Sequence, residues 1–511
     1  MIPEQLEYIL LAVYFISLCI LFVYGFHGYI MVHLYRKNAH KTPPDKTLQD
    51  SEAPMVTIQL PVYNEFYVLD RLVRAACSVD YPREKLHIQI LDDSTDETVE
   101  RSRFLVEKYS AEGFDIQLLH RSDRTGYKAG ALRDALPQAK GEFIAIFDAD
   151  FIPPRDFLRK TLPHFSSPDV GVVQTRWGHL NHDFSLLTRA QAIALDGHFV
   201  VEQAARNRSD LFINFNGTAG VWRKQCILDA GNWSDDTLTE DLDLSYRAQM
   251  RGWRFVYLQD VVCMAELPGK MTALKSQQFR WTKGAIETAR KILPKLWQSD
   301  LPLRVKLQGT IHLTNNMVFP FILLVALLNL PTMLLKNSDS PYSLFFAVCS
   351  FFVLAFFGSF LLYLHGQKEV YPDWKSRIAY FPVFLGGSMG LSLNNSWAIL
   401  QGALKIKSPF QRTPKFNIEG KNGSWNGKKY QGKETALVVL ELLMTVYTTS
   451  ALGLAVYYQE WAALPFMSLF AFGFAFIACT SCQQAGWTPE RLGVALKALV
   501  TGRRKEPVTT P

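Results

Sequence analysis

Cysteine is scarce in this sequence, and its spacing argues against a zinc site. Seven cysteines are scattered over 511 residues, and the only close pair is Cys479 and Cys482. Structural zinc modules take four ligands, usually arranged as two close pairs. A single pair inside an apolar run instead suits close packing between helices. We therefore expect a structural role for all seven cysteines.

Charged side chains are missing from residues 8–34, which are apolar or weakly polar throughout. A helix needs ~20 such residues to cross a bilayer, and the apolar core of a signal peptide is shorter than this run. The segment is therefore predicted to be a membrane anchor and not a cleaved signal. Further spans are expected at residues 307–335, 342–364, 436–458 and 461–482.

A Walker-type phosphate loop is also missing, although Gly126 and Lys128 suggest one at first sight. The spacing between the glycine and the lysine is wrong, and no Ser or Thr follows Lys128. This argues against phosphoryl transfer by a P-loop kinase. The glycine turn, Arg124 and Lys128 still suit a diphosphate at the start of a helix.

The net formal charge of +7 does not indicate a nucleic-acid partner. Lys and Arg gather next to the apolar runs, at residues 36–37, 405–433 and 503–505. This is the positive-inside pattern of membrane proteins. We therefore expect a lipid bilayer, and no nucleic acid, among the partners.

Short apolar runs alternate with amphipathic ones between the two membrane-like ends of the chain. Strands are predicted at residues 55–62, 86–91, 116–119 and 143–147, and helices at residues 66–79, 96–109 and 128–136. This alternation predicts an α/β fold with a mostly parallel sheet covered on both faces. Its ligand should lie off the carboxyl ends of the strands.

Acidic side chains follow two of these strands. Asp148 and Asp150 suit Mg²⁺ or Mn²⁺ held against a diphosphate, although surface turns also contain this pattern. Asp93 is a candidate for a nucleotide base or ribose, and one of the next residues, 94–96, should cap the following helix.

Asp241 lies in an acidic turn before a helix that starts near Leu242. Acids in a first turn also cap helices, so this cluster alone does not define a site. Gln277, Arg280 and Trp281 follow on a helix that runs toward the membrane. The two stretches together suggest a reaction centre.

Five motifs occur in the order typical of one family. They are Asp92-Asp93, Asp148-Ala149-Asp150, Phe215-Asn216-Gly217-Thr218, Thr239-Glu240-Asp241 and Gln277-Gln278-Phe279-Arg280-Trp281. The chain therefore resembles the processive family 2 glycosyltransferases, the group of cellulose, mannan and hyaluronan synthases. Residues 173–177 and 214–223 are most similar to the cellulose-synthase-like A and C branches and their bacterial relatives, which make β-1,4-linked mannan, glucomannan or glucan.

This resemblance implies a GT-A (nucleotide-diphospho-sugar transferase) domain inserted between transmembrane helices, and a role for each motif residue. Asp241 would be the general base, and Asp148 and Asp150 would bind the metal. Donor-binding residues would be Asp93, Lys128, Asp148, Asp150, Gln277 and Arg280, and acceptor-binding residues Phe215, Asn216, Gly217, Thr218 and Trp281. Trp281 could alternatively anchor the chain at the membrane surface.

A gating loop is implied at Phe410, Thr413 and Lys415, where the pattern Phe-x-Val-Thr-x-Lys is matched except that Arg412 replaces the valine. The sequence has no room for a cyclic-dinucleotide-sensing barrel and no cysteine-rich zinc module. Regulation by either route is not expected.

The expected organisation has six parts. They are a transmembrane helix at 1–37, a cytoplasmic catalytic domain at 53–300, a hairpin at 301–366, an interfacial or re-entrant segment with the gating loop at 376–433, a second hairpin at 434–484 and a basic cytoplasmic tail at 485–511. Residues 405–433 carry eight Lys or Arg residues and one acid. Because such loops stay cytoplasmic, residues 378–404 should not cross, leaving five crossings with the N-terminus outside.

The function expected from these features is an inverting, membrane-bound hexosyltransferase. It would polymerise sugar from GDP-mannose or UDP-glucose onto a growing polysaccharide and pass the product across a bacterial plasma membrane or a Golgi membrane. Whether a separate export protein assists stays open. The alternatives are transfer of one sugar to a lipid, a glycosidase that uses Glu240 and Asp241, and a transporter without chemistry.

Overall fold

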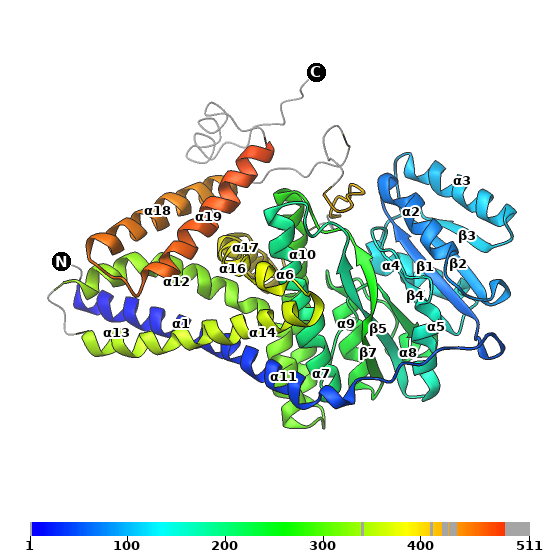
Figure 1. Cartoon of the computed structure of the whole chain (residues 1–511), viewed down its shortest axis with the longest axis horizontal. Helices are drawn as coiled ribbons and strands as arrows, with labels where there is room; N and C mark the ends of the chain where they lie inside the picture. The colour runs from blue at the N-terminus through cyan, green and yellow to red at the C-terminus, as the bar shows by residue number, and fades with distance from the viewer. Residues whose placement is uncertain (1–2, 339–341, 409–411, 422–427, 429–436, 486–511) are drawn as a thin grey trace, which may run out of the picture.

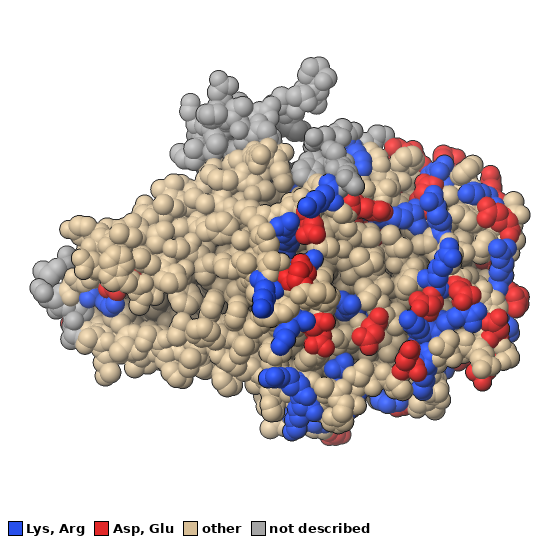
Figure 2. Space-filling model, in the orientation of Figure 1, with Lys and Arg blue, Asp and Glu red and all other residues tan. Residues whose placement is uncertain are grey.

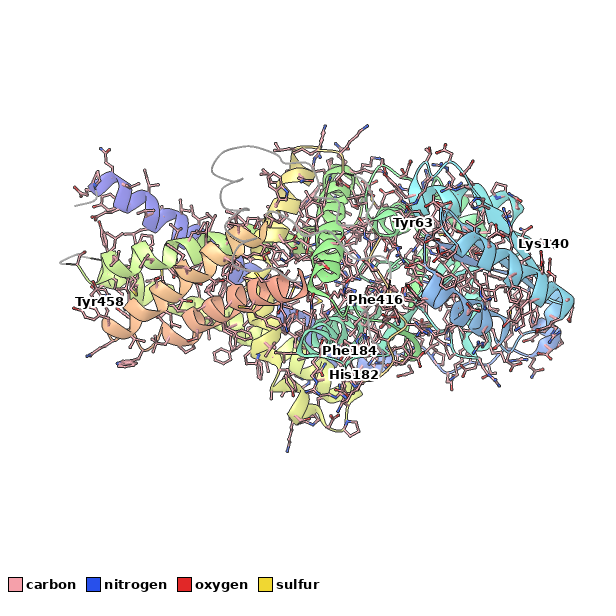
Figure 3. The ribbon with its side chains drawn as sticks, turned by 90° about the horizontal axis from the view of Figure 1, so that it is seen from above. Tyr63, Lys140, His182, Phe184, Phe416 and Tyr458 are labelled. Carbon is pink, nitrogen blue, oxygen red and sulfur yellow. The ribbon has the colours of Figure 1, made fainter. Side chains whose placement is uncertain are left out.

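The computed structural model describes residues 3–338, 342–408, 412–421, 428 and 437–485. The molecule has two halves along its long axis, a bundle of long helices and an α/β domain (Figure 1). Tyr458 marks the far end of the helical half, and Lys140 lies at the opposite end of the molecule (Figure 3).

Seven strands form one sheet in the α/β domain. They are β1 (Val56–Val62), β2 (Leu86–Asp92), β3 (Asp115–His120), β4 (Phe143–Ile146), β5 (Val170–His179), β6 (Gly220–Arg223) and β7 (Arg254–Ala265). Their order is β3-β2-β1-β4-β6-β5-β7. Only β6 runs antiparallel to its neighbours among these strands. The predicted mostly parallel sheet is confirmed.

The sheet forms because its central strands can be buried on both faces. Every residue of β1 and β2 is buried. Residues from α2 and α3 pack on one face, and residues from α4 and α9 pack on the other. Continuous apolar runs of this kind belong to covered parallel strands, whose carboxyl ends then share one edge.

The helices of the α/β half are α2 (Phe66–Cys77), α3 (Thr98–Ala111), α4 (Tyr127–Ala135), α5 (Phe157–Thr161), α6 (Leu186–Asp196), α7 (Gln203–Arg208), α8 (Lys224–Asp229), α9 (Glu240–Met250) and α10 (Met271–Gln298). A π-helical turn, Gly197–Glu202, joins α6 to α7. All four predicted strands and all three predicted helices are present. The strands β5, β6 and β7 are not among the predictions, and the pairing of β5 with β7 contains two register shifts.

The helical half contains α1 (Glu4–Lys37), α11 (Leu303–Thr314), α12 (Val318–Lys336), α13 (Ser343–Ser350), α14 (Leu354–Val370), α15 (Trp374–Ile378), α16 (Phe381–Gly390), α17 (Ser392–Ala403), α18 (Leu437–Tyr457) and α19 (Leu464–Ala485). Within the described residues, five helical segments are long and apolar enough to span a membrane, namely Glu4–Lys37, Leu303–Lys336, Ser343–Val370, Leu437–Tyr457 and Leu464–Gln484. The two short helices α16 and α17 occupy the segment that was predicted not to cross. The orientation of the chain stays a prediction.

The two halves also differ in how many charged side chains they expose. Figure 2 shows the helical half almost bare of Lys, Arg, Asp and Glu on this face, whereas these residues gather over the α/β half and along the boundary. A surface that is apolar over one half and charged over the other suits a protein that is partly embedded in lipid.

One buried ion pair ties α10 to the membrane-length helices. Lys275 Nζ lies 2.7 Å from a carboxylate oxygen of Glu441 on α18 and 2.7 Å from Ser481 Oγ on α19. The Met271 N–H at the start of α10 donates to the Gln484 side chain on α19. The helix that carries Gln277, Arg280 and Trp281 is therefore held by contacts in both halves of the molecule.

Candidate active site

A cavity of about 170 Å³ opens at the carboxyl ends of β1, β2 and β4, and residues of α10 line part of its wall. Figure 3 shows Tyr63 and Phe416 between α10 and the parallel part of the sheet. The predicted site residues that line this cavity are Asp93, Lys128, Asp148, Asp150, Asn216, Gly217, Asp241, Gln277, Arg280, Trp281, Thr413 and Lys415. Residues that lie far apart in the sequence thus meet where the sheet predicts its ligand.

The two carboxylates after β4 each face a lysine. Lys128 Nζ lies 2.5 Å from Asp148 Oδ1, and Lys415 Nζ lies 2.6 Å from Asp150 Oδ2. Among the described residues, no group of three or more His, Cys, Asp or Glu side chains could hold a metal ion. Two hard oxygen donors at a cavity wall fit Mg²⁺ or Mn²⁺ that takes its other ligands from water and a diphosphate.

Asp241 is placed by the first turn of α9 and by a glycine opposite. The side chain of Thr239, which precedes α9, makes no capping hydrogen bond. The Leu242 N–H donates to Asp241 Oδ1 at 2.8 Å. Gly217 has φ +78°, and a Cβ there would lie 3.1 Å from Asp241 Oδ2. Glycine therefore permits both this left-handed turn and the close approach to the carboxylate.

The surroundings of Asp241 suit a group that exchanges a proton near neutral pH. Burial, together with the adjacent Glu240 carboxylate, raises the pKa of Asp241 to about 7, although Lys128 opposes the shift. A carboxyl group with this pKa is ionised often enough to accept a proton and basic enough to hold it.

Lys128 is the central cation of the cavity. Its Nζ also donates to the Gly217 carbonyl at 2.9 Å and lies 3.9 Å from Glu240. Burial favours the neutral amine, but Asp148 and Glu240 outweigh burial and hold the pKa of Lys128 above its ordinary value. The ammonium therefore stays charged at the place where phosphate would bind.

Asp93 is held by an arginine that the sequence analysis did not single out. Arg121 Nε and Nη2 donate to the two oxygens of Asp93 at 2.8 and 2.6 Å. Beside this pair, the Arg124 guanidinium lies 3.3 Å from the centre of the Tyr63 ring. An aromatic ring, a planar cation and a carboxylate can together stack on and hydrogen-bond a nucleotide base. Asp96 Oδ1 accepts from the Thr98 N–H at 3.0 Å at the entry to α3, although the N-cap residue of that helix, Glu97, makes no side-chain capping bond.

Gln277, Arg280 and Trp281 share one face of α10, as a helix requires of positions i, i+3 and i+4. That face lines the cavity. Gly284, one turn further along α10, packs on Thr239, where a Cβ would lie 2.6 Å from Thr239 Cγ2. The close packing joins α10 to the turn that carries Asp241.

Two predicted acceptor residues are placed elsewhere. Phe215 is fully buried, and its ring packs edge to face against Trp222 in the core and not at the cavity wall. Thr218 is also buried, and its Oγ1 accepts from the Asp148 N–H at 2.9 Å. Because their side chains point into the protein, both residues support the site from behind. Asn216 and Gly217 keep their place at the wall.

The loop predicted to gate the site is described from residue 412 onward, and Phe410 lies outside the described residues. Arg412 Nη1 lies 3.5 Å from Glu65 Oε1. Burial raises the pKa of Glu65 to about 7, although Arg412 opposes the shift. Glu65 follows β1 on the same edge of the sheet as Asp93, so its position in the sequence was a usable signal.

Comparison with known proteins finds relatives of the segment that holds most of this site. Residues 53–284 match the family model described as glycosyltransferase like family 2. The chain is 42% identical over 257 residues to glucomannan 4-beta-mannosyltransferase 2 of Arabidopsis thaliana. The matched region covers 49% of this chain and 48% of that protein. It is 41% identical over 277 residues to glucomannan 4-beta-mannosyltransferase 1 of Oryza sativa subsp. japonica, with 53% of each covered. The chain thus spans about half the length of the curated relatives it matches.

A solved structure shows the same fold. It is a mannosyltransferase from Pyrobaculum calidifontis in complex with GDP-Man and Mn²⁺, with a TM-score of 0.54 and 19% identity. The match covers 78% of this chain and all of that one. The expected GT-A fold is confirmed.

Proposed function

We propose that the chain, whose residues 53–284 match the family model described as glycosyltransferase like family 2, is a processive hexosyltransferase that builds a β-1,4-linked polysaccharide. Mannose from GDP-mannose is the proposed donor sugar, supported by the relatives named as glucomannan mannosyltransferases. UDP-glucose is the second donor to test. The observation that carries the proposal is the single cavity that holds Asp241, the Asp148 and Asp150 pair and the Gln277 to Trp281 face of α10.

The proposed reaction is an inverting displacement at the anomeric carbon. Asp241 takes the proton of an acceptor hydroxyl while the oxygen of that hydroxyl forms the new glycosidic bond. The bond to the nucleoside diphosphate breaks, and Lys128 and Arg280 stabilise the negative charge on the departing group. Mg²⁺ or Mn²⁺ held by Asp148 and Asp150 would supply further positive charge to the diphosphate.

The proposed acceptor path leads from Trp281 toward the membrane-length helices. Trp281 offers a flat apolar face to a sugar ring. Helix α17 packs against α10. Within the described part of the chain, Ser392 Oγ and Asn395 Nδ2 on α17 are buried without a hydrogen-bond partner. A polymer rich in hydroxyl groups would supply such partners, which supports the proposal that the product passes between these helices.

The product of the purified protein tests this proposal. We expect radiolabelled GDP-mannose to yield a polymer that endo-β-1,4-mannanase digests, and UDP-glucose would yield a cellulase-sensitive polymer if glucose is used. A product that is extracted into organic solvent and carries one sugar would establish the alternative, transfer to a membrane lipid. Absence of turnover with either donor would overturn the proposal.

The pH dependence provides a separate prediction. We expect kcat/KM to rise as the pH increases through about 7, because below this value Asp241 is protonated and cannot accept the acceptor's proton. Glu65 has a similar pKa, so a Glu65→Gln variant is the control for the profile. The acid limb should keep its midpoint in this variant. A limb that disappears with Glu65 would show that Asp241 is not its source.

A further inference from the structure

The amide of Asn216 is held from two sides at the cavity wall. Gln203 Nε2 donates to Asn216 Oδ1 at 2.7 Å, and Asn216 Nδ2 lies 3.2 Å from His198 Nε2. The Asn216 backbone N–H also donates to Gln174 Oε1 at 3.1 Å. Both the position and the rotation of this amide are therefore fixed before any ligand arrives.

The donor and the acceptor of each hydrogen bond in this cluster can be assigned. Because Gln203 donates to the amide oxygen, the amide nitrogen faces His198 and can only donate to it. His198 Nε2 must then be the acceptor, and the proton of the neutral ring is on Nδ1. Nδ1 lies 3.2 Å from Glu202 Oε2, which accepts that proton in a hydrogen bond.

Glu202 is held as an acceptor by Arg206, whose Nε donates to Glu202 Oε1 at 3.0 Å. Burial opposes ionisation of this carboxyl group, but Arg206 and the hydrogen bond from His198 outweigh burial and hold the pKa of Glu202 well below its usual range. A carboxylate on one side and an amide on the other therefore select one tautomer of His198.

The π-turn explains why His198 and Gln203 reach the same amide. These residues are five positions apart, which places them about 140° apart around an α-helix with 3.6 residues per turn. Here the Gln203 N–H bonds to the His198 carbonyl in the i to i+5 pattern of a π-helix, which brings the two side chains to one side. The turn itself packs closely against α14, since a Cβ at Gly197 would lie 2.4 Å from the Tyr363 ring.

We infer that His198 is a positioning residue for the acceptor sugar, acting through Asn216. With one amide N–H directed to His198, the second N–H of Asn216 is oriented to donate to a hydroxyl oxygen of the terminal hexose. The π-turn is thus a device that fixes the register of the acceptor at the site of transfer. This inference rests on the proposed function, because it requires a sugar acceptor in the same cavity.

Replacing His198 by Phe tests the inference, because Phe keeps a ring of similar size but has no acceptor nitrogen. With GDP-mannose and a short β-1,4-linked manno-oligosaccharide, we expect the KM for the oligosaccharide to rise about tenfold, as for the loss of one oriented hydrogen bond. The KM for the donor should stay within about twofold. His198→Gln restores an acceptor oxygen and should recover most of the loss, and His40→Phe, at an exposed histidine outside the cavity, is the matched control.

A double-mutant cycle separates positioning from general support of the fold. Asn216→Ala should raise the acceptor KM, and adding His198→Phe to it should change that KM by less than about twofold. If the increases in acceptor KM of the two single variants multiply in the double variant, the inference is overturned. An unchanged acceptor KM in His198→Phe would also overturn it. If His198→Phe does not fold, Glu202→Gln is the second variant. It keeps the shape of the side chain at position 202 but removes the carboxylate that selects the tautomer of His198. The acceptor KM of Glu202→Gln must rise for the inference to stand.

The wild-type protein distinguishes failure of this inference from failure of the proposed function. If GDP-mannose is not consumed, the same measurements are made with UDP-glucose and a short β-1,4-linked gluco-oligosaccharide. If neither donor is consumed, the proposed function and the inference both fall. If a donor is consumed and the acceptor KM does not respond to His198, the inference alone fails.

Discussion

Replacing Asp241 by Asn is expected to lower sugar transfer by about 10²- to 10⁴-fold, the range that general-base catalysis contributes. The substitution keeps the shape of the side chain and its acceptor oxygen for the Leu242 N–H. It removes only the ability to take a proton from the acceptor hydroxyl. Because the loss belongs to the transition state, kcat should fall while the affinity for the donor changes little.

The cations that would hold the donor stay in place in this variant. Lys128 remains 2.5 Å from Asp148 and 3.9 Å from Glu240, so its charge is still balanced. Calorimetric titration with the nucleotide sugar, alongside turnover measured as nucleoside diphosphate release, separates binding from chemistry. A variant that retains more than about a tenth of the wild-type rate would contradict the general-base role.

Asp236→Asn is the matched control for that experiment. Asp236 lies five positions before Asp241, pairs with Lys291 at 2.8 Å and does not line the cavity. The same chemical change there should leave the rate near the wild-type value. Equal losses in the two variants would instead point to disruption of the segment before α9.

The parts of the site that the sequence predicts are those governed by local periodicity. A buried strand ends where its apolar run ends, so the run at 143–147 was enough to place Asp148 and Asp150 at the edge of the sheet. Helical spacing likewise placed Gln277, Arg280 and Trp281 on one face. Both predictions need only residues that are close in the chain.

The remaining parts depend on contacts between distant segments. Arg412 meets Glu65, and Lys415 meets Asp150, only because the loop packs back onto the sheet edge after the chain has passed through the helical half. No local pattern contains that information. Phe215 shows the opposite problem: it belongs to a motif that lines the cavity, but its own ring is fully buried in the core against Trp222.

The π-turn at 197–202 could not be predicted because it looks like ordinary helix in the sequence. The apolar residues of α6 and α7 continue through it without a break. Its extra residue is stabilised by tertiary contacts, namely the packing of Gly197 against α14 and the clamp on Asn216. Departures from regular geometry of this kind tend to occur at functional sites.

Removal of divalent metal is expected to abolish transfer, and Mn²⁺ or Mg²⁺ should restore it. The departing diphosphate carries more negative charge than Lys128 and Arg280 can balance. A metal contributes several kcal/mol to such a transition state, which corresponds to about 10³-fold or more in rate. The rate should be measured after exhaustive chelation, and then again as each ion is added back.

Asp148→Asn and Asp150→Asn should show the same loss, and excess Mn²⁺ should rescue them only in part, because each variant keeps one carboxylate of the pair. Asp156→Asn is the matched control, since this partly exposed acid follows the same strand and pairs with Lys160 outside the cavity. Direct binding of Mn²⁺ in the presence of a non-transferable nucleotide sugar would distinguish loss of the metal from loss of the fold. Full activity after chelation would remove the metal from the mechanism and leave Asp148 and Asp150 as partners of Lys128 and Lys415 alone.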